Sequence, residues 1–345
     1  MNSHLKYIVV FLILFSCKSN KEQQEVALTK SETHLTIAFG SCNRQTFDNK
    51  LWDPIAENDP TVWIWGGDVI YSDTDNMELM QEHYDQQMNQ KGYREFAENV
   101  KILGTWDDHD YGLNDGGTEF TAKSESQQLF LDFIGVAKDD ERRTREGVYH
   151  SEMVRTEKGT VNIIVLDTRY FRTSLTPSAD PEFRYQPNAY GEGSMLGEIQ
   201  WNWLEKELHN TEADFNLIMS SIQFLSKEHG YETWGNMPHE VDRLKALINA
   251  SKAKNVILIS GDRHISEFSK AEVEGIPYPL IDFTSSGMTH SYEGFDGEPN
   301  QYRVGEVVSS LSFGLLKFNF DSGTVVMEMR GIDNVLQQEL TQTYK

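Results

Sequence analysis

Seven short apolar runs are spread along the chain, and turn residues bound each of them. β-Branched and aromatic residues follow one another inside these runs with little polar interruption, which is typical of strands that are buried on both faces. Such strands need a covering layer on each side, so they constrain the fold strongly. The runs are residues 35–42, 61–68, 100–108, 161–168, 215–221, 255–262 and 279–286.

Segments with helical periodicity lie between several of these runs. The clearest are residues 77–99, 124–133, 197–209 and 240–253, and in the third of them Ile199, Trp203, Leu204 and Leu208 are spaced as one apolar stripe. Strands that alternate with helices predict an α/β fold with crossover helices. Near the end of the chain, the sequence DSG separates two apolar segments, which predicts a hairpin.

No repeat or internal linker interrupts residues 35–345, so we expect one domain there. Residues 173–194 form a long stretch that is rich in Pro, Gly and aromatic residues. Long loops in compact domains tend to be functional, so this stretch is expected to be an ordered surface loop near the functional site.

The first residues have the features of an export signal. Lys6 precedes an apolar run, residues 7–15, that is too short to cross a bilayer as a helix. The sequence LFSC resembles a bacterial lipobox, in which Cys17 would be lipidated; the alternative is an ordinary secretory signal with an incidental Cys17. We therefore predict a signal peptide over residues 1–16 and a flexible tether over residues 17–34.

These features predict an exported, lipid-anchored protein in the periplasm or at the cell surface. Lys18 after the lipobox does not resemble an inner-membrane retention signal, which favours the outer membrane. The formal net charge is −23, and no basic run offsets it. Nucleic acid and anionic membrane surfaces are therefore unfavourable partners, although bound metal cations could still allow an acidic site to hold an anion.

Cys42 has no partner within the chain if Cys17, the other of the two cysteines, carries lipid. An exported protein normally pairs or removes its thiols. Two explanations for Cys42 stay open, namely a buried thiol that acts as a small apolar residue and a metal-bound thiolate.

Potential metal ligands follow one predicted strand after another. Ligands of open α/β sheets bind at the carboxyl ends of the strands, so these side chains are expected to share one site. Carboxylates favour hard cations, whereas thiolate, phenolate and imidazole favour transition metals, and the mixture predicts a cluster of unlike metals. The residues are Cys42, Asp68, Tyr71, Asp107, Asp108, His109, Asp110, Asp167, Gln223, Asp262 and His264.

Five motifs occur in a fixed order: AFGSCNR, GGDVIYSD, TWDDHDYGLND, LDTRYFR and SGDRH. Together they resemble the alkaline phosphatase D (PhoD-type) family of the calcineurin-like metallophosphoesterase superfamily, over residues 35–291. The resemblance implies a four-layer αββα sandwich and a centre of Fe³⁺ and Ca²⁺ that hydrolyses phosphate esters.

The resemblance implies six metal ligands. Three would bind iron, two would bind the harder neighbouring ion, and one carboxylate would bridge the metals. The iron ligands would be Cys42, Tyr71 and His264, the bridge Asp68, and the ligands of the harder ion Asp108 and Asp262. A buried core tyrosine is the alternative for Tyr71.

The resemblance also implies three catalytic residues. His109 would donate to the phosphate or protonate the leaving oxygen, and Asp110 would orient its imidazole. Arg44 would bind phosphate oxygens through its guanidinium, with a structural ion pair as the alternative.

Several further residues stay open. Asn114, Gln223 and Arg169 are possible metal or substrate contacts. Asp107 could fix the loop or bind metal through water, and Asn114 and Asp115 could join a calcium shell. Asp167 and Arg169 are expected to support the site or contact substrate rather than bind metal. His290 is a weak extra candidate, for which a satisfied surface histidine is the alternative.

The function expected from these observations is metal-dependent hydrolysis of phosphomonoesters, phosphodiesters or both, by a water that the metals activate. One alternative is a phospholipase C-type phosphodiesterase on the same site, because specificity depends on loops rather than on the fold. The other is a non-catalytic surface lipoprotein that binds glycan or calcium.

Overall fold

The structure is a computed structural model that describes residues 34–251 and 253–344. The predicted signal peptide, the tether up to residue 33 and Cys17 lie outside these residues. No helix in the described ranges is both long and apolar enough to cross a membrane.

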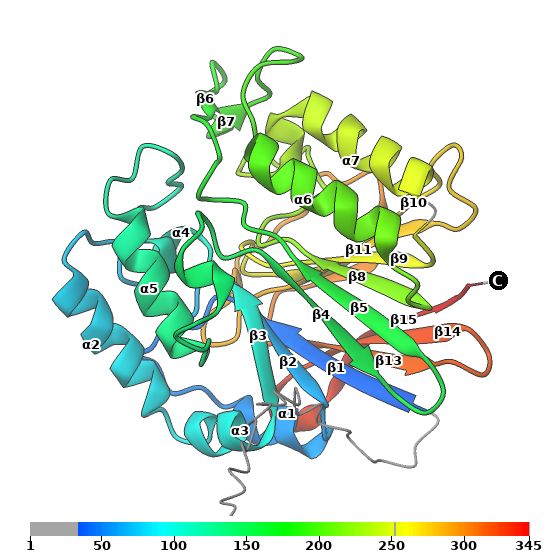
Figure 1. Ribbon diagram of the computed structural model, residues 1–345, viewed down its shortest axis with the longest axis horizontal. Coiled ribbons are helices and arrows are strands. Elements are labelled where there is room, and N and C mark those ends of the chain that lie inside the picture. Colours follow the sequence, from blue (N-terminus) through cyan, green and yellow to red (C-terminus); the bar gives the residue numbers. More distant parts are fainter. Residues whose placement is uncertain (1–33, 252, 345) are drawn as a thin grey trace, which may run out of the picture.

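Two large sheets form the centre of the molecule (Figure 1). The first has the order β15 (Leu336–Thr343), β14 (Thr324–Arg330), β13 (Phe313–Asn319), β1 (His34–Gly40), β2 (Val62–Gly66) and β3 (Lys101–Thr105). The second has the order β12 (Arg303–Val308), β10 (Ser266–Ala271), β11 (Leu280–Ser285), β9 (Val256–Ser260), β8 (Phe215–Met219), β5 (Thr160–Val165) and β4 (His150–Arg155).

Each sheet contains a parallel block. In the first sheet β1, β2 and β3 are parallel, and in the second β5, β8, β9 and β11 are parallel. All carboxyl ends within a block lie at the same edge of its sheet, so the loops that follow these strands are brought together.

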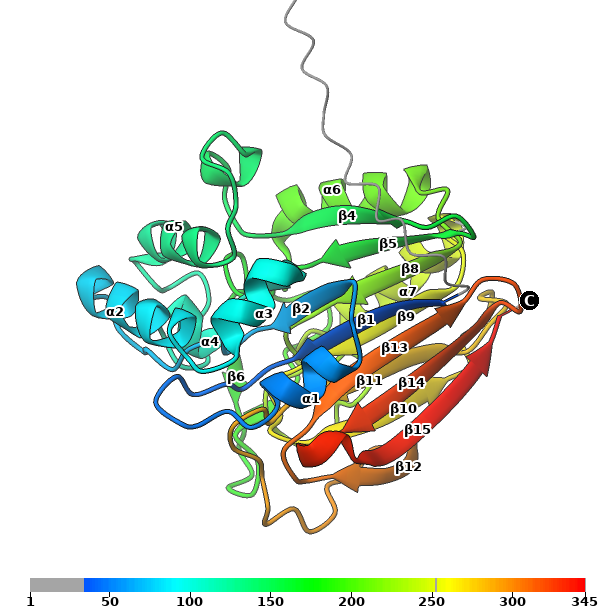
Figure 2. The same ribbon diagram turned by 90° about the horizontal axis from the view of Figure 1, so that it is seen from below.

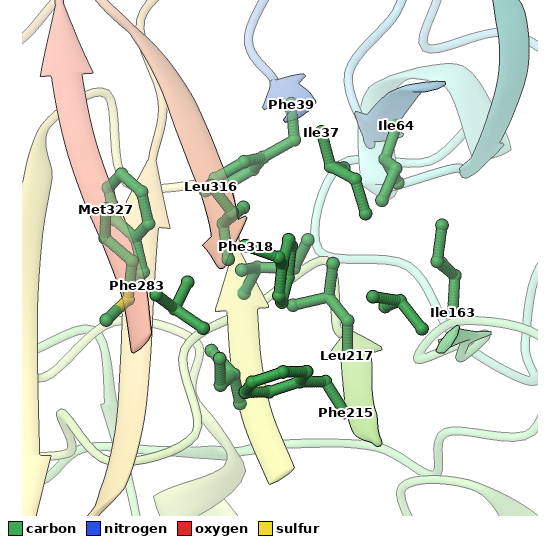
Figure 3. Close-up of a cluster of buried hydrophobic side chains, with 14 of the residues drawn as sticks. Ile37, Phe39, Ile64, Ile163, Phe215, Leu217, Phe283, Leu316, Phe318 and Met327 are labelled. Atoms are coloured by element: carbon green, nitrogen blue, oxygen red, sulfur yellow. The ribbon is translucent and has the colours of Figure 1, made fainter. Parts of the chain in front are cut away.

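Apolar side chains fill the space between the two sheets. Phe39 on β1 and Phe283 on β11 meet edge to face, with ring centroids 4.9 Å apart, which ties the first sheet to the second. Burial stabilises the sandwich by ~1.5–3 kcal/mol for each large apolar side chain. Figure 3 labels Ile37, Phe39, Ile64, Ile163, Phe215, Leu217, Phe283, Leu316, Phe318 and Met327 of this layer.

Helices cover the outer face of each sheet. On the first sheet lie α1 (Trp52–Glu57), α2 (Met77–Met88), α3 (Tyr93–Asn99) and α5 (Lys123–Phe133), and Figure 2 shows α1 and α3 beside β1 and β2. On the second sheet lie α6 (Gly197–Asn210) and α7 (Pro238–Ser251). The predicted four-layer αββα sandwich is therefore confirmed.

The remaining elements are short. They are α4 (Asp108–Tyr111), the 3₁₀ turns η1 (Glu141–Arg143), η2 (Trp234–Asn236) and η3 (Ile332–Asn334), and the small hairpin of β6 (Thr176–Pro177) and β7 (Tyr185–Gln186). The hairpin lies within the long loop 173–194, and α4 directly follows β3.

All seven predicted buried strands occur, but two helix predictions need correction. The single helix expected over residues 77–99 is two helices, because Gly92 has a φ of +84° between α2 and α3. The stripe predicted on α6 is correct at Leu204 and Leu208, which are buried. It is wrong at Ile199, which is 59% exposed, whereas Trp201 is buried. Trp201 points inward because its indole N–H donates to Glu240 Oε2 at 2.8 Å.

Strands β4, β10, β12 and β15 are not expected from the sequence. Their residues are polar or mixed, as in "SEFSKA" and "LQQELTQT". These segments form strands because they pair antiparallel with neighbouring strands. Such pairing cannot be predicted from a local apolar pattern.

Candidate metal centre

The loops after the parallel strands turn sharply where the candidate ligands stand. Cys42, Asp68, Asp262 and His264 all have positive φ, at 58°, 51°, 66° and 54°. Residues with a Cβ rarely adopt this left-handed backbone, and strained positions of this kind cluster at functional sites. The local backbone thus gives up stability to direct these four side chains.

Gly67 lets two of the loops approach each other. It precedes Asp68 with a φ of +94°, and a Cβ on it would lie 2.3 Å from the Cβ of Asp107. A larger residue would force the loop after β2 away from the loop after β3. Glycine at this position therefore keeps Asp68 within reach of the WDDHD segment.

The first group of donors contains sulfur, oxygen and nitrogen. Single ligand atoms of Cys42, Asp68 and His264 all lie within 4.8 Å of one another. The hydroxyl of Tyr71 donates to Asp68 Oδ2 at 3.1 Å and lies 3.0 Å from His264 Nε2. Ser286 Oγ donates to the sulfur of Cys42 at 3.0 Å, which is a supporting contact not expected from the sequence.

Oxygen donors dominate the adjoining groups. Asp108 belongs to three of them: one with Asp68 and His109, one with Asp107 and Asp262, and one with Asp115 and Glu232. Asp68 belongs to both the mixed group and the first of these oxygen-rich groups. The six predicted metal ligands are thus brought together, with Asp68 between the two kinds of donor.

The acidity of these groups indicates that positive charge belongs among them. Burial raises the pKa of Cys42 to about 12, and burial also raises the pKa values of Asp68, Tyr71 and Asp262. Raised pKa values mean that these groups hold their protons more tightly than the same groups do in water. Metal binding releases such protons, so the donor chemistry fits a metal centre with a soft and a hard side.

His109 is held by a carboxylate other than the one expected. Its Nδ1 lies 2.8 Å from Asp73 Oδ2. Asp73 is the last residue of the motif GGDVIYSD, so its place in that motif is a signal that could have identified it. Burial alone would lower the pKa of His109, but Asp68, Asp73 and Asp108 outweigh it and raise that pKa to about 10. A protonated His109 can donate a proton through Nε2.

Asp110 does not orient the imidazole, which corrects the expectation. Its carboxylate accepts the backbone N–H groups of Asp107, Asp68 and Val69, at 2.6, 3.3 and 3.1 Å. It is fully buried at the start of α4, and burial raises its pKa to about 8. Asp110 therefore fixes the two metal-binding loops to each other.

Arg44 is available for an anion. Its guanidinium carbon lies 4.7 Å from the ring centroid of Tyr71 and 5.4 Å from that of Phe47. Among residues 34–251 and 253–344 it has no ion-pair partner, so the structural ion pair weighed as its alternative is not formed. His290 is half-buried, with its ring centroid 4.4 Å from that of His264 and 5.0 Å from that of Tyr71.

Arg169 is a buried support and not a substrate contact. Its Nε donates to Asp107 Oδ1 and its Nη1 donates to Glu232 Oε2, both at 2.7 Å. The whole side chain is inaccessible to solvent. Glu232 is not expected from the sequence, since it lies in a loop with no preceding motif, and Arg169 connects this loop to the WDDHD segment.

Three further residues whose roles the sequence left open have different positions in the structure. Gln223 is buried and donates to Glu267 and Thr284, both at 2.8 Å, so it supports the second sheet. Asp167 accepts the indole N–H of Trp106 at 2.9 Å and is also structural. Asn114 lines the cavity at the centre, as described below.

Replacing Arg169 by methionine should destabilise the fold by about 3–5 kcal/mol, because Asp107 and Glu232 would remain buried without a cation. The urea midpoint of unfolding measures the loss. Lys158→Met is the matched control: Lys158 pairs with Asp321 at the surface, and its removal should change stability by no more than about 0.5 kcal/mol. Equal midpoints for the two variants would contradict the supporting role of Arg169.

A cavity of about 380 Å³ opens beside the donors. Its lining includes Asp108, His109, Asp262 and His264. The loop 173–194 closes part of its rim, because Tyr185 Oη donates to Asp115 at 2.6 Å and Arg184 pairs with Asp115 at 2.5 Å. The expected position of this loop near the site is confirmed.

The arrangement of two packed sheets is shared with solved phosphatase structures. A dimetal phosphatase from Danio rerio shares this fold with a TM-score of 0.54, at 12% identity over 90% of this chain and 99% of that one. A structure of PhoD is similar with a TM-score of 0.69, at 16% identity over 90% of this chain and 68% of that one.

The model of the PhoD-like phosphatase family matches residues 37–292, so the chain belongs to that family. Alkaline phosphatase D of Bacillus subtilis (strain 168) is 25% identical over 118 residues, which are 32% of this chain and 20% of that protein. The match thus spans about a fifth of that relative. The resemblance seen in the sequence motifs is confirmed at the level of the family.

Proposed function

We propose that the chain is a metal-dependent phosphohydrolase that cleaves phosphate esters at this centre. One observation supports this most directly: Asp68 and Asp108 connect a sulfur- and imidazole-containing donor group to all-oxygen groups, beside an open cavity. Membership of the PhoD-like phosphatase family supports the same reaction class.

We propose Fe³⁺ and Ca²⁺ as the metals. Thiolate, phenolate and imidazole from Cys42, Tyr71 and His264 suit ferric iron, whereas the carboxylates of Asp108 and Asp262 suit calcium. Asp68 lies within reach of both sets. Metal ions held there would polarise the phosphoryl group and increase the acidity of an attacking water.

The protein's own groups have separate tasks in this proposal. Asp73 contacts Nδ1 of His109, which leaves Nε2 to give a proton to the departing oxygen. Arg44 has no carboxylate partner in the described part of the chain, so its guanidinium can offset charge on the phosphate oxygens. Ser286 and Asp110 hold Cys42 and the loops in position.

Elemental analysis together with a substrate panel tests the proposal. The purified protein should contain iron and calcium, absorb visible light through thiolate or phenolate bound to ferric iron, and hydrolyse p-nitrophenyl phosphate or its bis-ester. Removal of metal should abolish turnover, and readdition should restore it. A metal-loaded protein that cleaves neither ester would refute the proposed reaction.

We also propose that the protein is exported and held to a membrane by lipid on Cys17, with the outer membrane favoured. The LFSC sequence and the polar stretch that follows it support this. Replacing Cys17 by serine should move the protein from the membrane fraction to the soluble fraction, whereas Cys42→Ser should not. Retention of the Cys17 variant in the membrane would contradict lipid anchoring.

A further inference from the structure

We propose that the cavity beside the metal centre binds the organic part of the ester, and that this part is a hydroxylated ring, as in a sugar or a nucleoside. The inference rests on the proposed function, since the phosphate itself would lie at the metals. Its evidence comes from the cavity-lining residues that are not predicted metal ligands.

The residues that line the cavity carry charged, amide, hydroxyl, imidazole or phenol groups. Among the described residues, none with an aliphatic side chain lines it. Small-molecule sites are usually mostly apolar, and an acyl chain gains affinity only by covering apolar surface. A phosphate ester with an organic group that forms hydrogen bonds therefore fits this cavity better than a lipid tail does.

Two tyrosines add aromatic rings to the lining of the cavity. Tyr231 and Tyr292 come from different loops, and each is 42% exposed. The backbone N–H of Tyr292 donates to the carbonyl of His264 at 2.8 Å, which fixes this tyrosine to the metal-binding loop. Exposed tyrosines give flat apolar faces with a polar edge, a combination suited to the faces of sugar rings and bases.

Hydrogen-bonding groups surround these rings. Arg263 lies 4.5 Å from the centroid of the Tyr231 ring and pairs with Glu298 at 2.5 Å, so its guanidinium is held rigidly. Guanidinium, carboxylate and hydroxyl groups of this kind can form hydrogen bonds with the hydroxyl groups of a ring.

A comparison of matched substrates tests the inference. Glucose 6-phosphate and uridine 5′-monophosphate represent the two sources of a ring, and ethyl phosphate is the small reference; each is supplied as the monoester and as the methyl diester. In the wild type, kcat/KM should be higher for at least one ring ester than for its ethyl counterpart. The arm with the larger preference identifies a sugar or a nucleoside.

The variants Tyr231→Ala and Tyr292→Ala should each reduce the ratio of kcat/KM for that ring ester to kcat/KM for the ethyl ester by roughly two- to tenfold. Using a ratio removes changes common to both substrates. Tyr231→Phe and Tyr292→Phe keep the ring face and should recover at least half of the lost ratio. Tyr190→Ala is the control, because Tyr190 is 70% exposed, bonds to Asp242 and does not line the cavity.

Three outcomes would overturn the inference. The first is equal wild-type kcat/KM for ring and ethyl esters, and the second is a ratio that stays unchanged in both alanine variants. The third is faster cleavage of a phosphatidylcholine vesicle than of any ring ester, which would indicate a lipid substrate. Failure to cleave any ester of the panel would instead refute the proposed function, so the two failures are distinguishable.

Discussion

Replacing Asp68 by alanine should remove most of the bound metal and reduce kcat/KM by at least about a thousandfold. A ligand atom of Asp68 lies within 4.8 Å of those of Cys42 and His264, and one also lies within 4.8 Å of those of Asp108 and His109. Loss of this one carboxylate should therefore weaken both proposed metal positions, and bound metals would supply several kcal/mol of transition-state stabilisation. Elemental analysis and steady-state kinetics measure the two effects.

The matched control for Asp68 is Asp75→Ala. Asp75 is an exposed carboxylate a few residues further along the same loop and belongs to none of the donor groups. This variant should keep its metal content and its turnover. If Asp68→Ala instead retained full metal content and wild-type activity, the bridging position assigned to Asp68 would be wrong.

Replacing His109 by alanine should lower kcat by about two to four orders of magnitude and leave the metal content unchanged. The proposed task of His109 is to give a proton to the leaving oxygen, whereas the six predicted ligands would bind metal. Elemental analysis together with kcat distinguishes this variant from Asp68→Ala. Wild-type turnover by His109→Ala would refute the catalytic assignment.

Asp73→Asn provides a graded test of the same residue. The carboxylate of Asp73 helps to raise the pKa of His109, so its removal should lower that pKa. The protonated form of His109 predominates below its pKa and is lost as the pH rises through that value. The high-pH limb of the kcat profile should therefore move to lower pH in Asp73→Asn. An unchanged profile would show that Asp73 does not act through His109.

The positions of the ligands could be predicted from the sequence to a large extent. Each parallel strand is a continuous apolar run, and Cys42, Asp68 and Asp262 follow the ends of three of them. Parallel packing brings such ends to one edge whatever the details of the loops. For this reason the shared location of the six predicted ligands agrees with the sequence, whereas the four-layer αββα architecture was implied by the family resemblance.

Partners within the site were harder to predict. Asp110 is adjacent to His109 in the chain, yet the helical turn of α4 directs its carboxylate toward the backbone of Asp68 and Val69. The imidazole is reached by Asp73 from another loop. Similarly, Arg169 pairs with Asp107 and Glu232 across more than sixty residues of sequence in each case.

The sequence by itself determined the seven buried strands, the helical segments between several of them, the family and the kinds of donor at the strand ends. These depend on local apolar patterns and on residue types at short spacing, which the chain displays directly. Only the tertiary structure decided that Asp73 holds His109, that Arg169 is buried with Glu232, and that Tyr231 and Tyr292 share one cavity. Those contacts depend on the positive φ angles of the loops and on how two sheets face each other, so no local pattern encodes them.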